Sequence, residues 1–553
     1  MPTSKIPNQL RCWLFAWLCT VPYSTPAQSF TSSNLPIIVI NTDGAEIVNE
    51  PKINVFMGVI NNGPGQRNNL SDPFTDYEGT IGIEIRGSSS RSFPKKQYGI
   101  EVRDPMGQDS SVSLLGMPKE SDWVLYAPYS DKSLMRNVLA YEWSRSLSRY
   151  APRTRFCEVV LNGSYQGVYV LIEKIKRDKE RVDIAKLREE DTSGEEVTGG
   201  YIIKIDKIEG GGGQGWTSAY PPLQKQGNQT IYFQYDYPKS DEITPEQQTY
   251  IQQYITSFED ALKGDDFTNP DAGYAQYIDL GSFVDYFLAN EIARNPDAYR
   301  ISAFMHKQKE TDGGKLAMGP IWDFNLGFGN VDFCMKGGTE GLVIDYNSVC
   351  PQDQWLVPFW WSRLFQDPAF AERVATRWTG LRSAQFATDR MLAQVDSVAD
   401  LLNEAQPRNF ARWPVLGQYV WPNAFVGQTY QEEVGQLKSW ISGRMSWLDN
   451  NLPKPTSVIT STENDVSSES GASVYPNPFQ DALTIEFTAP RSGIAALRIY
   501  DLLGKTVLRS ASYYATAGPQ SLLWNTSSLV PGMYVMQLQI DNQPLITRKI
   551  NKQ

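Results

Sequence analysis

Short apolar runs broken by turn residues dominate the chain up to about residue 240. Such runs, bounded by Gly, Pro, Asn or Asp, are typical of β-strands. Two strands within residues 35–60 are joined by a turn at Asp43-Gly44, and a further turn is expected at Asn162-Gly163. The other predicted strands cover residues 81–86, 98–102, 156–161, 167–172 and 201–205. One helix, Ser133 to Leu147, is expected among them.

From about residue 244 the apolar positions follow a helical period instead. Thr244-Pro245-Glu246-Gln247 combines an N-cap residue, a proline at the first helical position and a Gln three residues after the cap. One apolar face follows, made of Tyr250, Ile251, Tyr254, Ile255, Phe258 and Leu262. Further helices are predicted at about 281–293, 370–382, 390–404 and 430–449. A strand-rich part to about 240 and a helix-rich part after it predict an α+β fold, built as two lobes.

The two ends of the chain have different patterns. Residues 1–27 resemble a secretory signal peptide, with Lys5 and Arg11 before the apolar run Cys12–Val21 and small residues up to Ala27. The alternative is a buried N-terminal helix. A permanent membrane anchor needs about 20 apolar residues, so we expect no transmembrane segment here or later in the chain.

The C-terminal part is predicted to be a separate domain. Residues 453–472 have the Ser, Thr and Pro content of a linker. Residues 473–553 contain short alternating strands broken by Pro and Gly, which predicts a small all-β sandwich.

Composition excludes several classes of function. With one histidine, His306, among 553 residues, the chain has too few imidazoles for a His-based zinc site or a two-His iron site. The net charge of −11 argues against sequence-independent binding to nucleic acid. Outside residues 1–27 the cysteines are Cys157, Cys334 and Cys350. The last two bracket a Gly-rich segment and would be free to pair in an oxidising compartment, whereas Cys157 is expected to be buried.

Two acidic segments are candidates for chemistry. Asp323 and Asn325 stand two residues apart, so in extended backbone both side chains point the same way and offer oxygen ligands to one divalent cation. The alternative is a structural turn capped by Asp and Asn. Asp297 lies just after a predicted helix, where it would act as a base or metal ligand or would only cap a turn.

A basic hairpin is the third candidate. Arg86 and Arg91 flank a glycine and three serines, and Lys95 and Lys96 follow. Arginines, lysines and hydroxyls together are suited to a phosphate chain, although a solvated basic hairpin has the same composition. Lys204, on a predicted strand, would add a further phosphate contact.

In combination these segments resemble the CotH kinase family. The resemblance runs from about residue 35 to 450 and rests on Ile83–Arg91 with Pro94-Lys95-Lys96, Trp123-Val124-Leu125, Asp131–Asn137, Asn162-Gly163, Gly167-Val168-Tyr169, Glu173, Asn295 with Asp297, Pro320–Asn325 and Phe328-Gly329. It implies an atypical protein kinase of two lobes that uses ATP with Mg²⁺ or Mn²⁺ to phosphorylate Ser or Thr of a protein substrate. The acceptor protein is not implied.

The resemblance also implies roles for single residues. Asp297 corresponds to the catalytic aspartate that orients the accepting hydroxyl, and Asp323 to the catalytic aspartate that holds the metal. Asn325 stands where the family often has a second Asp, which would weaken metal binding. The implied nucleotide-binding residues are Arg86, Arg91, Lys95, Lys96 and Lys204.

The tail resembles the type IX secretion sorting domain, through Val474–Phe479, Leu497–Asp501 and Gly532–Val535. This implies contact with the type IX secretion machinery and a secreted or cell-surface protein. Because ATP is scarce outside cells, a structural or binding protein with weak or lost catalysis on the same fold remains the alternative to a kinase. A glycosidase using Asp297 and Asp323 has no supporting motif.

Overall fold

The computed structural model of the chain describes residues 30–208, 215–455, 473–489, 493–501, 506–509, 513–540 and 543–553. The chain divides into two compact units, Met1–Thr456 and Ser457–Gln553. The predicted signal peptide, and the predicted linker from residue 456 on, lie outside the described residues. Helices and sheets are mixed in the larger unit, and the smaller one is all-β among its described residues, which confirms the α+β class.

A closed β-barrel forms the N-terminal part of the larger unit. Its described strands, in order around the barrel, are β2 (Ile37–Asn41), β3 (Ile53–Ile60), β5 (Tyr77–Ile85), β6 (Tyr98–Arg103), β7 (Asp122–Tyr126), β9 (Ser164–Glu173) and β8 (Thr154–Leu161). The parallel pair β2–β8 closes it. Two short strands, β1 (Ser32–Ser33) and β4 (Asn68–Asn69), pair separately. Asn162 and Gly163 both have positive φ, as a two-residue hairpin turn of type I′ requires.

The sequence pattern predicted these barrel strands except β7. All five residues of β7 are buried, so the strand lacks the alternation of apolar and polar residues by which a half-exposed strand is recognised. Cys157 on β8 is buried and unpaired, as expected.

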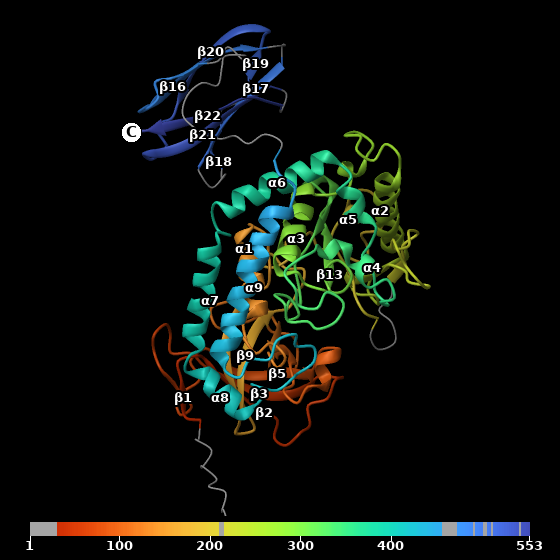
Figure 1. Cartoon of the computed structure of the whole chain (residues 1–553), viewed down its shortest axis with the longest axis vertical. Helices are drawn as coiled ribbons and strands as arrows, with labels where there is room; N and C mark the ends of the chain where they lie inside the picture. Colours follow the sequence, from red (N-terminus) through yellow and green to blue (C-terminus); the bar gives the residue numbers. More distant parts are fainter. Residues whose placement is uncertain are drawn as a thin grey trace, which may run out of the picture. The chain divides into compact units, whose positions relative to one another are not determined.

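A second sheet and most of the helices make up the rest of the larger unit. The sheet has the order β11 (Gly215–Thr217), β12 (Tyr232–Tyr237), β10 (Tyr201–Ile205), β13 (Ala303–Lys307) and β14 (Leu316–Met318). The helices are α1 (Arg136–Ser146), α2 (Pro245–Lys263), α3 (Leu280–Ala293), α4 (Tyr346–Val349), α5 (Trp360–Leu364), α6 (Pro368–Arg382), α7 (Thr388–Leu402), α8 (Ala405–Arg412) and α9 (Tyr430–Asn451). Figure 1 shows the barrel strands β2, β3 and β5 at one end of this unit and α2, α3 and α5 at the other.

The predicted start of α2 is confirmed in detail. The Thr244 side chain accepts a hydrogen bond from the Gln247 backbone, and the Gln247 side chain accepts one from the Thr244 backbone. This capping box satisfies amides that have no partner within the helix. The predicted apolar face then buries Ile251, Ile255 and Phe258.

The described residues of the smaller unit form two antiparallel sheets. One has the order β15 (Ser473–Tyr475), β16 (Ala482–Ala489) and β20 (Gly518–Asn525). The other has the order β18 (Thr506–Arg509), β17 (Gly493–Tyr500), β21 (Gly532–Ile540) and β22 (Gln543–Lys552), with β19 (Tyr513–Ala515) also paired to β17. Residues of both sheets, among them Ile485 and Met536, share one hydrophobic core.

A fully buried ion pair joins α3 to α9. Arg444 Nη2 lies 3.0 Å from Glu291 Oε2, and neither side chain is exposed. Arg444 also donates to the carbonyls of Thr339 and Gly341, while Glu291 accepts from the Val343 amide. The pair therefore fixes two helices and the segment 339–343 together. Burial lowers the pKa of Arg444 to about 10 and raises that of Glu291, because both charges have left water.

Cys334 and Cys350 form a disulfide, with their Cα atoms 5.8 Å apart. The pairing that the sequence left open is therefore present. It connects the segment after Phe333 to the end of α4.

Replacing Arg444 by Met should lower the free energy of unfolding by about 3–5 kcal/mol, because Glu291 would remain buried without its partner. The matched control is Lys438→Met on the same helix. Its ion pair with Asp396 is partly exposed, so the loss should stay below about 1 kcal/mol. Urea unfolding followed by tryptophan fluorescence measures both, and equal losses would show that the buried pair does not stabilise the fold.

Candidate functional site

A cavity of about 700 Å³ brings most of the predicted site residues together. We call it the main cavity. Its walls come from the barrel, from α1, from β10 and from the loops after α3 and β14. The predicted residues that line it are Arg86, Arg91, Lys204, Asp297, Asp323 and Asn325.

The loop that carries Asp323 is held by α1. Asp131 is fully buried just before this helix and accepts hydrogen bonds from the Ser133 hydroxyl and the Arg136 amide. The following turns present Asn137 and Tyr141 to the loop. Asn137 Oδ1 accepts from the Phe324 amide at 2.6 Å, and the Tyr141 hydroxyl accepts from the Asp323 amide at 3.1 Å.

These contacts hold Asp323 in a backbone conformation that side chains rarely adopt. Its φ is +62°, in the left-handed region. Such strain persists only where the surroundings fix it, and it is often found at functional sites. Asp323 and Asn325 both line the cavity, but the extended backbone on which their spacing argument rested is absent, since Asp323 is left-handed.

Asp323 has both acidic and basic neighbours, and burial is the largest influence on its pKa. Burial, the Asp297 carboxylate and the Asp206 carboxylate together raise the pKa of Asp323 to about 6, although Arg86 and Lys207 act in the opposite direction. The site therefore holds carboxylates close enough to repel one another. A cation placed among them would relieve that repulsion.

Asp297 follows the end of α3, where Arg294 adopts a left-handed conformation and ends the helix. Asn295 connects the two acidic loops: its side chain accepts from the Asp297 amide at 3.3 Å and donates to the Asp323 carbonyl at 3.5 Å. Asp297 Oδ1 also pairs with Arg300 Nη2 at 2.9 Å, which fixes the orientation of the carboxylate.

Three of the predicted cations face the same cavity. The Arg86 guanidinium lies 5.6 Å from the centre of the Trp322 ring, and Arg91 donates to the Asn49 side chain at 2.9 Å. Lys204 Nζ lies 3.2 Å from Asp236. Burial disfavours the charged form of Lys204, but the Asp236 and Asp206 carboxylates outweigh it and raise its pKa, so Lys204 carries a positive charge.

The structure does not bring Lys95 and Lys96 into this cavity. Lys95 Nζ is buried and donates to the Val168 carbonyl at 2.5 Å and to Asn409 Oδ1 at 2.8 Å. Burial lowers its pKa to about 7. Lys95 thus connects β9 to α8, a structural contact that a basic sequence motif does not distinguish from phosphate binding. Lys96 Nζ donates to the Arg91 carbonyl instead.

Sequence reasoning missed other residues of the main cavity, namely Asp206, Lys207, Arg300, Asp353 and Trp355. Asp206 accepts from the amides of Lys207 and Ser302, and burial raises its pKa. One signal was present in the sequence. Asp206 directly follows the last residue of β10 and stands two residues after Lys204, so the spacing of extended backbone would place both side chains on the same side.

The oxygen atoms of Asp323 and Asn325 are the donors best suited to a metal such as Mg²⁺. Across the described ranges, the structure contains no group of three or more His, Cys, Asp and Glu side chains that could hold a metal ion. Phosphate oxygens and water would complete the coordination of an ion held by Asp323 and Asn325. Mg²⁺ usually binds in this manner, with one or two carboxylates completed by phosphates and water.

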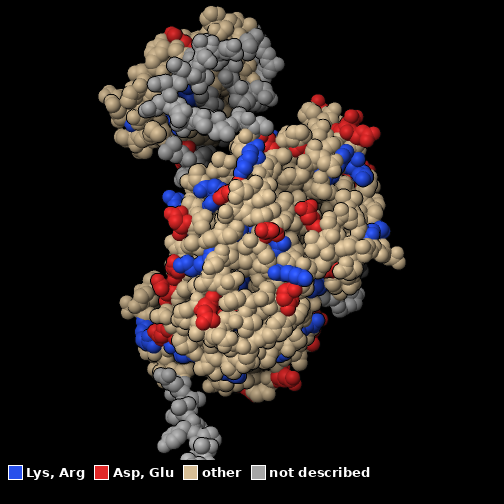
Figure 2. Space-filling model, viewed as in Figure 1, with Lys and Arg blue, Asp and Glu red and all other residues tan. Residues whose placement is uncertain are grey.

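The surface charge of the larger unit is mixed. Figure 2 shows Lys and Arg interspersed with Asp and Glu on the face in view, without a broad patch of one sign. None of the helices among the described residues is long and apolar enough to cross a membrane.

Comparison with known proteins gives two family matches and one curated relative. Residues 83–448 match the CotH kinase protein family, and residues 473–553 match the secretion system C-terminal sorting domain. The inner spore coat protein H of Bacillus subtilis (strain 168) is 34% identical over 95 residues, which are 17% of this chain and 24% of that protein. The chain thus matches about a quarter of the length of this relative.

The sorting domain indicates that the protein is secreted or displayed at the cell surface, and it implies contact with the secretion machinery. The other match extends over most of the larger unit and includes every predicted site residue, from Arg86 to Asn325. The chain belongs to the CotH kinase protein family.

Proposed function

We propose that this protein is a secreted, metal-dependent kinase that transfers the γ-phosphoryl group of ATP to Ser or Thr hydroxyls of a protein. The observation that carries the proposal is the convergence of Asp297, Asp323, Arg86, Arg91 and Lys204 on one cavity. Phosphoryl transfer needs little covalent chemistry from the protein. It depends on positioning the reactants and on neutralising charge on the phosphates.

The cations are arranged to neutralise charge on the phosphates. Arg86 and Arg91 lie at the two ends of a short loop whose serines, Ser88, Ser89 and Ser90, also line the cavity. Arginine forks and hydroxyls bind phosphate oxygens. Lys204 reaches the same cavity from β10 on the second sheet. ATP bound there would have its phosphates between the barrel and that sheet.

The donor set around Asp323 suits Mg²⁺ or Mn²⁺. Asp323 and Asn325 would hold the ion, and the repulsion between Asp323, Asp297 and Asp206 favours a cation at this position. When bound, the metal would neutralise the charge of the phosphate oxygens. Asn325 contributes an oxygen without a charge, so the protein would bind the metal more weakly than a relative with two aspartates.

Asp297 would orient the acceptor. Its carboxylate is held by Arg300 at 2.9 Å and by the loop that Asn295 fixes. A carboxylate that is fixed in this way accepts a hydrogen bond from the attacking hydroxyl and so sets its direction. The barrel and the sheet with its helices would then be the two lobes of a kinase, with the main cavity between them.

The second candidate function on the same fold is that of a binding protein. A cell-surface binding protein would keep the cavity but would have weak or no transfer activity, and Asn325 is the residue that favours this alternative. The two functions differ in a direct test, since only a kinase gives metal-dependent incorporation of label from ATP.

Replacing Asp323 by Asn should reduce incorporation of radiolabel from γ-labelled ATP by at least about 100-fold, as expected for loss of a charged group that acts on the transition state. ATP with Mg²⁺ should raise the melting temperature of the wild type but not of this variant. The matched control is Asp332→Asn, which changes an exposed carboxylate outside the cavity lining. Absence of label and of any thermal shift in the wild type would exclude the kinase and leave the binding protein.

The affinity for Mn²⁺ should depend on pH through Asp323. Its pKa in the metal-free protein is raised to about 6, so the carboxylate is ionised at neutral pH and becomes protonated below about pH 6. We expect the dissociation constant to rise about tenfold per pH unit there, because a proton and the metal compete for the same oxygens. Calorimetric titration between about pH 5 and pH 8 measures this, and Asp323→Asn should remove the step at pH 6.

Replacing Asn325 by Asp should tighten Mn²⁺ binding by roughly tenfold, since an added anionic ligand raises affinity for a hard cation. Asn325→Ala, which removes the oxygen, should weaken binding. Titration of both variants against the wild type at pH 7.5 tests the assignment. If neither substitution alters the affinity, residue 325 is not a metal ligand.

A further inference from the structure

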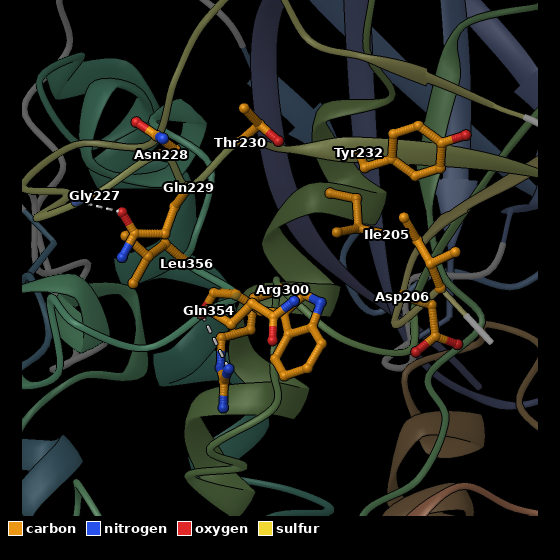
Figure 3. A pocket seen from close by; sticks show the side chains of 12 residues that line it. Ile205, Asp206, Gly227, Asn228, Gln229, Thr230, Tyr232, Arg300, Gln354 and Leu356 are labelled. Atoms are coloured by element: carbon orange, nitrogen blue, oxygen red, sulfur yellow. Dashed lines mark hydrogen bonds between the residues drawn. The ribbon is translucent and has the colours of Figure 1, made fainter. Parts of the chain in front are cut away.

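A second pocket of about 390 Å³ opens beside the main cavity, and we call it the side pocket. Figure 3 shows Gln354, Arg300 and Asp206 along one side of it and Asn228, Thr230 and Tyr232 along the other. Ile205 and Leu356 are buried and give it apolar walls.

The side pocket adjoins the main cavity. Asp206, Arg300 and Trp355 line both. Arg300 is also the partner of Asp297, so the two spaces adjoin on the side of the proposed hydroxyl-orienting carboxylate. The arginines of the barrel loop, Arg86 and Arg91, line the main cavity but not the side pocket.

The charge of the side pocket does not suit a phosphate group. Among the lining residues that the structure describes, Arg300 is the only cation and Asp206 the only anion. The Arg300 guanidinium already donates to the carbonyls of Pro296 and Trp355 and pairs with Asp297 and Asp353. A phosphate would have to displace these partners. The remaining polar walls are uncharged amides and hydroxyls.

We infer that the side pocket binds an uncharged segment of the acceptor polypeptide, next to the residue that is phosphorylated. This inference rests on the proposed function. Side-chain amides such as those of Asn228 and Gln354 both donate and accept hydrogen bonds, as the backbone of an extended peptide requires. Ile205, Leu356 and Trp355 provide contact for an apolar side chain.

The position of the side pocket sets the direction in which the acceptor peptide would run. With its flanking residues in the side pocket, the acceptor Ser or Thr would extend past Arg300 toward Asp297. The nucleotide would occupy the main cavity. A bulky side chain in the side pocket should therefore weaken binding of the acceptor peptide and leave the affinity for ATP unchanged.

The test compares three variants of the full chain. Gln354→Trp and Thr230→Trp each place a large side chain at an exposed position of the pocket wall. Gln352→Trp is the matched control, because Gln352 is exposed, lies two residues away and does not line the pocket. The probe is a degenerate array of Ser- and Thr-containing peptides. Peptide capture is measured without ATP, label transfer with γ-labelled ATP, and ATP binding by calorimetry.

We expect both pocket variants to lose at least about tenfold in peptide capture and label transfer, with ATP binding within about twofold of the wild type and the control unchanged. Three results would overturn the inference: no peptide capture by the wild type, equal capture by wild type and pocket variants, or a loss of ATP binding in the pocket variants. If the wild type captures peptides and the variants do not, but no label is transferred, the side pocket stands as a peptide site and the kinase proposal fails.

Discussion

The buried ion pair between Glu291 and Arg444 is the contact on which the acidic side of the main cavity depends. Taking both charges out of water costs several kcal/mol per ion, and only a complete set of hydrogen bonds offsets this. The pair meets that requirement by binding the segment 339–343 as well as α3 and α9. Glu291 lies one helical turn before Asn295. The pair therefore anchors the last turn of α3, from which the left-handed Arg294 and the Asn295 contacts lead the chain to Asp297.

The cavity combines a rigid frame with unfavourable charge. The backbone of the two acidic loops is held by hydrogen bonds to Tyr141, Asn137 and Asn295. Burial and acidic neighbours raise the pKa of Asp323. A fold selected for stability alone would not keep carboxylates in mutual repulsion at one place. This repulsion is the physical argument for the proposed cation at this place, and it is independent of the family match.

The sequence predicted those elements whose stabilising interactions are made between neighbouring residues. The capping box at Thr244 and the turn at Asn162-Gly163 depend on neighbouring residues, and both are present. β7 was missed because a strand buried on both faces shows no alternation. Lys95 was grouped with the phosphate-binding residues because composition does not show that its ammonium reaches Asn409, more than 300 residues away. Asp206 was overlooked because the fold, and not the sequence, brings the end of β10 next to Asp297 and Asp323.

The disulfide between Cys334 and Cys350 connects the assembly of the site to the location of the protein. Phe333 and Asp353, which both line the main cavity, lie close in sequence to the two bridged cysteines. Disulfides form and persist in oxidising surroundings and are rare in the cytosol. We therefore expect the bridge beside this wall of the cavity to form during or after export, where the sorting domain directs the chain. Maturation outside the cytosol would separate the finished site from the large ATP pool and proteins of the cell interior.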